Sequence, residues 1–73
     1  MTPCKFQMDA TGESIFIYSE DRETVHAQSF DPEFVGIISE ALGMMPLTKK
    51  YAMAEINDAG EIAIGDELSP QPF

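Results

Sequence analysis

The segment FDPEFVGIISEALGMMP, which starts at Phe30, contains the signals that start and end a helix, and it limits what the rest of the chain can form. Asp31 is a good N-cap residue because its carboxylate can accept a hydrogen bond from a free backbone N–H of the first turn. Pro32 suits the first helical position, where no N–H partner is needed. Gly43 favours the left-handed conformation that follows a helix, and the proline three residues later prevents continuation. The segment therefore predicts one helix over Pro32–Leu42.

This helix is amphipathic and needs an apolar surface beside it. With about 100° between successive residues, its large apolar side chains fall within one arc of about 160°. The opposite side carries Gly36, Ser39 and Glu40. The arc consists of Phe34, Val35, Ile37, Ile38, Ala41 and Leu42. One short helix cannot bury such an arc by itself, so the flanking segments must supply a sheet.

Three strands are expected before the helix, with Gly12 supplying the positive φ of the first tight turn. In the second strand Ile15 and Ile17 fall on one face while Phe16 and Tyr18 fall on the other. Because both faces are apolar, this pattern favours a central strand covered on two sides. The three expected strands are Cys4–Asp9, Ser14–Ser19 and Thr24–Phe30.

The segment after the helix predicts a hairpin, with strands over Thr48–Ile56 and Glu61–Leu68 around the turn formers of Asn57–Gly60. The whole order is βββαββ, which indicates the α+β class: a small antiparallel sheet with one amphipathic helix packed on a face. Short connections favour pairing within the first three strands and within the last two. Residues 1–73 are expected to form one small acidic domain, with residues 69–73 as an extended C-terminal tail.

The charge balance restricts the partners. Thirteen acidic residues stand against four basic ones, which gives a net charge of −9 and a pI near 4.1. Nucleic acid and anionic membranes attract basic patches, so the sequence predicts no direct nucleic acid partner and no membrane partner. Cys4 is the only cysteine and no apolar run is long enough to span a bilayer, so we expect a cytoplasmic protein.

The sequence supplies few parts for catalysis or metal binding. Structural zinc needs about four Cys or His ligands, and the chain offers one of each, Cys4 and His26. The stretch EINDAGEIAIGD would place Ala59 at a ligand position of a calcium loop, so a hairpin is favoured there. His26 is expected on a strand, on a polar face with Thr24 and Gln28, and no serine lies in a strand-to-helix elbow. We therefore predict no enzymatic activity, no metal and no cofactor.

The acidic surface is the main candidate site. Neighbouring positions on one strand face lie about 6.7 Å apart, roughly twice the rise per nucleotide of a DNA strand, so carboxylates could imitate a row of phosphates. Met44 is expected to close the helix end against Ile38, which leaves Met45 and Leu47 as an exposed apolar pair. The predicted partner-binding residues are Glu20, Asp21, Glu23, Asp58, Glu61, Asp66, Glu67, Met45 and Leu47.

These features favour a non-enzymatic binding protein that places its acidic face against a basic protein surface. The most concrete version is an inhibitor that occupies the nucleic-acid-binding site of its target, as DNA mimics and the anti-defence proteins of phages and mobile elements do, anti-CRISPR proteins among them. That comparison rests on size and charge alone. The alternative is a structural domain that self-associates as a homodimer or serves as a subunit of a larger complex.

Overall fold

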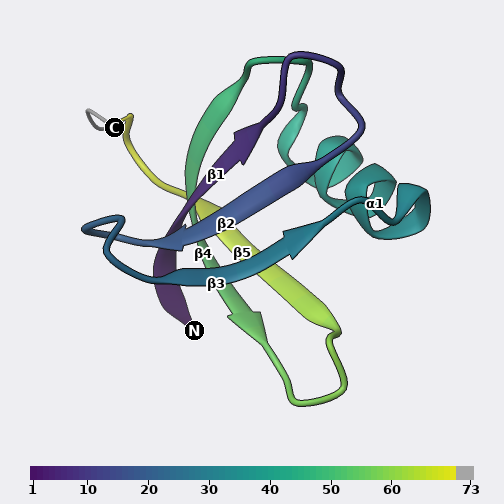
Figure 1. Cartoon of the computed structure of the whole chain (residues 1–73). Coiled ribbons are helices and arrows are strands. Elements are labelled where there is room, and N and C mark those ends of the chain that lie inside the picture. Colours follow the sequence, from purple (N-terminus) through teal and green to yellow (C-terminus); the bar gives the residue numbers. More distant parts are fainter. Residues whose placement is uncertain (71–73) are drawn as a thin grey trace.

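The computed structural model describes residues 1–70 of the chain and has the expected α+β architecture, five strands and one helix in the order βββαββ (Figure 1). The predicted tail lies partly outside the described residues: Ser69 and Pro70 have no regular secondary structure, and residues 71–73 are not described. The elements are β1 (Thr2–Met8), β2 (Ile15–Ser19), β3 (Val25–Ser29), α1 (Pro32–Leu42), β4 (Lys49–Ile56) and β5 (Ile62–Glu67).

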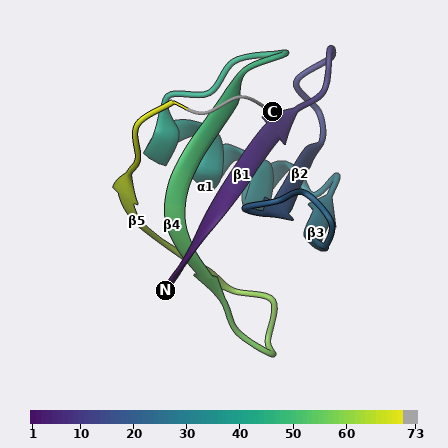
Figure 2. The same cartoon turned by 90° about the vertical axis from the view of Figure 1, so that its left-hand side faces the viewer.

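The strands form one antiparallel sheet in the order β3-β2-β1-β4-β5. The first three strands pair in sequence and β4 pairs with β5, as the short connections predict. The two groups are joined by β1, whose Cys4 lies opposite Ser19 of β2 and Ala52 of β4. Figure 2 shows α1 lying behind β1 and β4, so the helix covers one face of the sheet. The opposite face is called the outer face below.

The core lies between α1 and the inner face of the sheet. Phe6, Ile15, Ile17, Ile38 and Ala52 are fully buried there. They are joined by Cys4, Met8, Val35, Leu42, Met44 and Ala54.

The ends of α1 have the capping geometry that the sequence predicts. Asp31 is extended at φ −68° and ψ 116°, and its carboxylate accepts a hydrogen bond of 3.1 Å from the backbone N–H of Glu33. Gly43 adopts the left-handed conformation with φ 63°, and its N–H reaches the carbonyl of Ser39. Met44 closes this end of the core, being 6% exposed, as expected.

The helix buries a narrower stripe than its apolar arc suggests. Val35, Ile38 and Leu42 are buried, whereas Phe34 is only partly buried and Ile37 remains 53% exposed. The sheet has only five short strands, and the helix contacts it along one line of side chains. One side of the arc is therefore left at the surface.

The outer face corrects one expectation. Phe16 and Tyr18 of β2 are half-buried, and among the described residues no second layer of helix or strand covers them. Their rings instead stack on each other, with centroids 5.9 Å apart, and the guanidinium of Arg22 lies 4.5 Å from the centre of the Tyr18 ring. Apolar residues on both faces of a strand thus reflect ring stacking and a cation–π contact here.

A bulge in β3 changes the expected placement of His26. Ile17 pairs with Ala27 while Tyr18 pairs with Val25, so His26 is the extra residue of an irregular register. The alternation that would place His26 on one face with Gln28 is therefore broken. His26 is exposed, as expected of a strand histidine outside the core.

Among residues 1–70, the structure has no helix long and apolar enough to cross a membrane.

Candidate protein-binding surface

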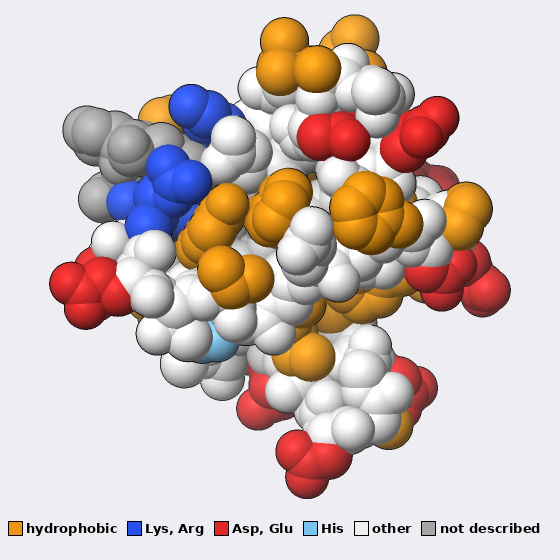
Figure 3. Space-filling view, in the orientation of Figure 1, with side chains coloured by type: hydrophobic (Ala, Val, Ile, Leu, Met, Phe, Trp, Pro, Cys, Tyr) orange, Lys and Arg blue, Asp and Glu red, His pale blue; other side chains and the backbone are white. Residues whose placement is uncertain are grey.

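The basic side chains of the protein gather on the outer face. Lys5 lies opposite both Tyr18 and Tyr51 on the neighbouring strands, and Lys49 pairs with Gln7 on the same face. Arg22 reaches this face from the β2–β3 turn, where its guanidinium donates a 3.2 Å hydrogen bond to the Gln7 side chain. Figure 3 shows the visible Lys and Arg side chains together in one region. The basic residues therefore adjoin the acidic β2–β3 turn, where Lys5 interacts electrostatically with Asp21, whereas the β4–β5 turn contains no Lys or Arg.

The predicted acidic residues lie at turns and strand ends, in three groups rather than one row. Glu20, Asp21 and Glu23 share the β2–β3 turn, and Asp58 and Glu61 share the β4–β5 turn. Both turns leave the end of the sheet at which β1 begins, but β1 separates them. The third group, Asp66 and Glu67, ends β5, where Glu67 forms a 3.4 Å ion pair with Lys50. Figure 3 accordingly shows red side chains around the rim of the molecule.

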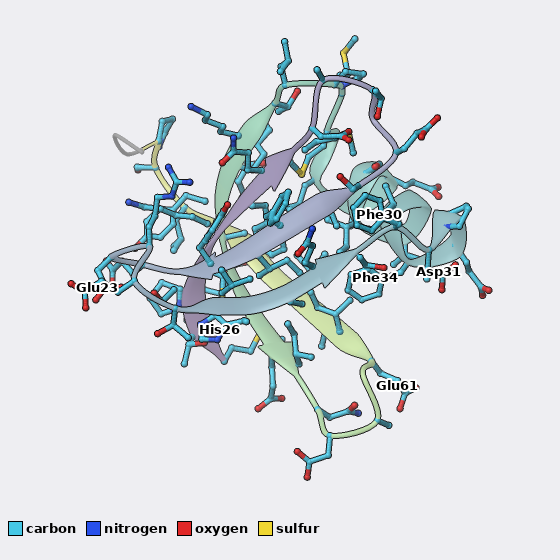
Figure 4. All side chains as sticks on the ribbon, in the orientation of Figure 1. Glu23, His26, Phe30, Asp31, Phe34 and Glu61 are labelled. Carbon is cyan, nitrogen blue, oxygen red and sulfur yellow. The ribbon has the colours of Figure 1, made fainter. Side chains whose placement is uncertain are left out.

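Two residues of the β2–β3 turn have structural partners. Glu20 accepts a 2.6 Å hydrogen bond from the Tyr51 hydroxyl, which connects this turn to β4 across β1. Asp21 accepts hydrogen bonds from the Ser19 hydroxyl at 2.6 Å and from the backbone N–H of Glu23 at 2.9 Å. These bonds lower the pKa of Asp21, the Ser19 bond most strongly. All three residues are exposed, and the carboxylate of Glu23 is directed away from the turn (Figure 4).

The contact between Glu20 and Tyr51 makes the stability sensitive to high pH. The hydrogen bond to Glu20, with burial, raises the pKa of Tyr51 above the usual 10.0. Because the folded-state pKa exceeds that of the unfolded chain, the stabilisation from the hydrogen bond between Tyr51 and Glu20 is complete below about pH 10. It is lost as pH rises through the folded-state pKa of Tyr51. We expect the urea midpoint to fall less steeply above about pH 10 in Tyr51→Phe than in the parent. In Glu20→Gln the phenolate absorbance of Tyr51 should appear at lower pH, and an unchanged titration would contradict this contact.

The β4–β5 turn projects from the body (Figure 1), and its two carboxylates are exposed. Asn57 builds the turn, because its side-chain carbonyl accepts hydrogen bonds of 3.0 Å from the backbone N–H groups of both Ala59 and Glu61. Gly60 provides the left-handed residue with φ 80°. Asp58 and Glu61 are both exposed in this hydrogen-bonded turn.

Glu61 also borders a groove that the sequence reasoning did not identify. The groove lies between α1 and the start of β5, has a volume of about 380 Å³, and combines apolar and acidic residues. Its apolar part is formed by Phe34, Ile37 and Ile62, and its carboxylates are Asp31, Glu33 and Glu61. Figure 4 shows Asp31, Phe34 and Glu61 around this region. This set of six residues is called the acidic groove below.

One signal in the sequence could have indicated the acidic groove. The apolar arc of the helix is wider than the stripe that a small sheet buries, and Ile37 lies in the excess part. Helix capping and the helix dipole fully explain Asp31 and Glu33, so their positions in the sequence do not indicate a binding role. Their proximity to Glu61 depends on the packing of α1 against β5 and has no local signature.

The exposed apolar pair lies at the other end of the sheet. Met45 is 68% exposed and Leu47 is 69% exposed, as predicted, in the connector between α1 and β4. Leu47 has a left-handed backbone with φ 67°, and its N–H donates to the carbonyl of Asp9 at 3.1 Å. The structure therefore does not bring this pair together with the acidic β4–β5 turn.

His26 lies beside a separate hollow of about 380 Å³ that Cys4 and Glu55 also line. Cys4 is 3% exposed, and its thiol contacts the Thr2 hydroxyl at 3.8 Å. Over residues 1–70, no group of three or more His, Cys, Asp or Glu side chains is arranged to hold a metal ion.

The chain matches no protein-family model, no curated protein and no solved structure.

Proposed function

We propose that this protein is a non-enzymatic binding domain whose acidic surface attaches to a basic surface of another protein. The observation that carries the proposal is the separation of charge. Three of the four basic residues, Lys5, Arg22 and Lys49, share the outer face, and the fourth, Lys50, lies within reach of Glu67. The carboxylates at the start of α1 and in the β4–β5 turn therefore lie where no Lys or Arg lines the surface between them.

Such a surface acts mainly on the rate and selectivity of association. Uncompensated negative charge draws a positively charged partner and disfavours nucleic acid and anionic membranes, which we do not expect to bind directly. In the specific form that we favour, the partner is a cytoplasmic nucleic-acid-binding protein, and the domain inhibits it by occupying its basic site. An anti-defence protein of a phage or mobile element would work in this way.

The direct test is charge reversal in the β4–β5 region. Immobilised native protein is expected to retain basic proteins from a host lysate at low salt and to release them at high salt. One of these proteins is then purified, and its affinity is measured for a variant that combines Asp58→Lys, Glu61→Lys, Asp66→Lys and Glu67→Lys. At low salt this affinity should be about a hundredfold lower than the affinity for the native protein. Displacement of a labelled oligonucleotide from the purified protein tests the inhibitory form.

The control carries Lys49→Gln, a substitution at an exposed position of the outer face that raises the net negative charge. This control should bind at least as tightly as the native protein. An affinity that stays the same in the charge-reversed protein, with the same salt dependence, would disprove the proposal.

The alternative function is self-association or incorporation in a larger complex, and the exposure of Met45 and Leu47 favours it. The two edge strands of the sheet, β3 and β5, offer further unpaired backbone groups. Sedimentation over a range of concentrations separates the two functions, because a monomer at every concentration removes the homodimer.

A further inference from the structure

The first half of α1 has an apolar side that the fold leaves without a partner. Val35 and Ile38 point into the core, but Ile37 is 53% exposed and Phe34 is only partly buried. Ile62, at the start of β5, is also partly buried and lies with them in the acidic groove. An aliphatic and an aromatic side chain held at the surface beside a third apolar residue form a small preorganised contact area.

The charge around this contact area has one sign. Asp31 and Glu33 come from the start of α1, and Glu61 comes from the β4–β5 turn. All three are exposed, and the Asp31 carboxylate accepts the hydrogen bond that caps the helix. In the part of the chain that the structure describes, no Lys or Arg lines this groove.

We propose that the acidic groove binds an amphipathic cationic segment of a partner protein, in which aliphatic side chains alternate with Arg or Lys. The aliphatic side chain packs on Phe34, Ile37 and Ile62, and the flanking basic groups lie over the carboxylates of Asp31, Glu33 and Glu61. Arg and Lys fit such a site because their methylene stems can cover apolar surface while the charged groups remain in water. This inference rests on the proposed function and places its binding site in the acidic groove.

A second copy of this chain does not have a suitable segment. The adjacent bases Lys49 and Lys50 begin β4, where both pair with β1 and Lys50 forms an ion pair with Glu67, so this segment cannot lie in a groove without leaving the sheet. Arg22 stands between Asp21 and Glu23, whose charges oppose its entry into an acidic groove. The chemistry therefore favours a different, basic protein.

Two synthetic peptides test the assignment. Both are blocked at their ends and contain the same number of arginines, separated by leucine in one and by glycine in the other. Titration calorimetry at low and moderate salt is expected to show tighter binding of the Arg/Leu peptide to the native protein, because only this peptide can use the apolar part of the groove.

The site is tested with two variants of equal net charge. The groove variant combines Asp31→Asn, which preserves the helix cap, with Glu33→Gln and Glu61→Gln. The control variant combines Glu13→Gln, Glu40→Gln and Glu55→Gln, three exposed residues that lie outside the groove and outside the predicted partner-binding set. We expect the groove variant to bind the Arg/Leu peptide about tenfold more weakly and the control variant less than about twofold more weakly.

A third variant, Ile37→Ser, changes only the apolar part. It should weaken binding of the Arg/Leu peptide about fivefold to tenfold and leave binding of the Arg/Gly peptide unchanged. The groove assignment would be overturned if the groove and control variants lost the same affinity for the Arg/Leu peptide, or if Ile37→Ser did not change that affinity. Either result would still be compatible with binding by the acidic surface as a whole. If the native protein binds neither peptide at low salt, the proposed function fails, and this inference fails with it.

Discussion

Phe6→Ala is expected to lower the free energy of unfolding by about 3–5 kcal/mol. Phe6 is fully buried in β1, the central strand, and lies opposite Ile17 of β2 under the helix. The substitution removes an aromatic ring from a close-packed core that cannot collapse around the cavity. A domain of this length has only about 4–11 kcal/mol of stability in total. The variant should therefore lose a large part of its stability, which circular dichroism during urea unfolding would show as a much lower midpoint.

The control for this prediction is Phe30→Ala, which removes the same side chain from a position that is 65% exposed. A change of about 0.5 kcal/mol or less is expected there. Similar losses in the two variants would mean that Phe6 does not occupy the core as described.

Two Gly→Ala substitutions are expected to change the stability in opposite directions. Gly12, in the β1–β2 turn, has φ 76°, and an added Cβ would lie 3.0 Å from Cγ of Pro46. Gly12→Ala should lower the free energy of unfolding by about 1–2 kcal/mol, because a left-handed backbone disfavours a side chain. Gly36, inside α1, has no atom within 4 Å of an added Cβ. Gly36→Ala should raise the free energy by about 0.5–1 kcal/mol, because alanine loses less conformational freedom in a helix.

Urea unfolding of both variants, analysed with a common m-value, gives the difference directly. The combined difference of about 1.5–3 kcal/mol is well above the error of such a comparison. A Gly12→Ala variant as stable as the parent would show that the β1–β2 turn can rearrange away from Pro46.

The local signals of this sequence predict the elements well. Asp31, Pro32 and Gly43 give the helix boundaries to the residue, and the turn formers at Asn57 and Gly60 place the second hairpin. The strand limits differ by one or two residues at their ends, where pairing rather than composition decides the assignment. Cap and turn chemistry acts over a few residues, so it can be identified without tertiary information.

The features that the sequence leaves open or places differently depend on how the elements pack. Nothing in the local pattern of β1 indicates that it pairs with β4 as well as with β2, and the bulge at His26 depends on how β3 fits the twist of β2. The outer face was predicted to be covered, because stacking of Phe16, Tyr18 and Arg22 resembles a buried pattern in sequence.

The sequence predicts that acidic side chains form the candidate site, but it does not predict which of them lie close together. The acidic residues of the two turns are at the surface, yet Glu20 and Asp21 are held by Tyr51 and Ser19. The acidic groove combines Glu61 with the start of α1, which is distant in sequence, and only tertiary packing creates that combination.

The central position of β1 affects the order of events during synthesis. Its Thr2 side chain bonds to the carbonyl of Ala54, 52 residues further along the chain. A nascent chain that has formed only β1, β2, β3 and α1 therefore exposes the edge of its innermost strand, together with the apolar side chains that β4 later covers. Unpaired apolar edges of this kind promote aggregation. If the ribosome paused before Tyr51, the partial chain would depend on chaperones to avoid aggregation. Loss of β5 alone would instead expose only the outer edge of β4.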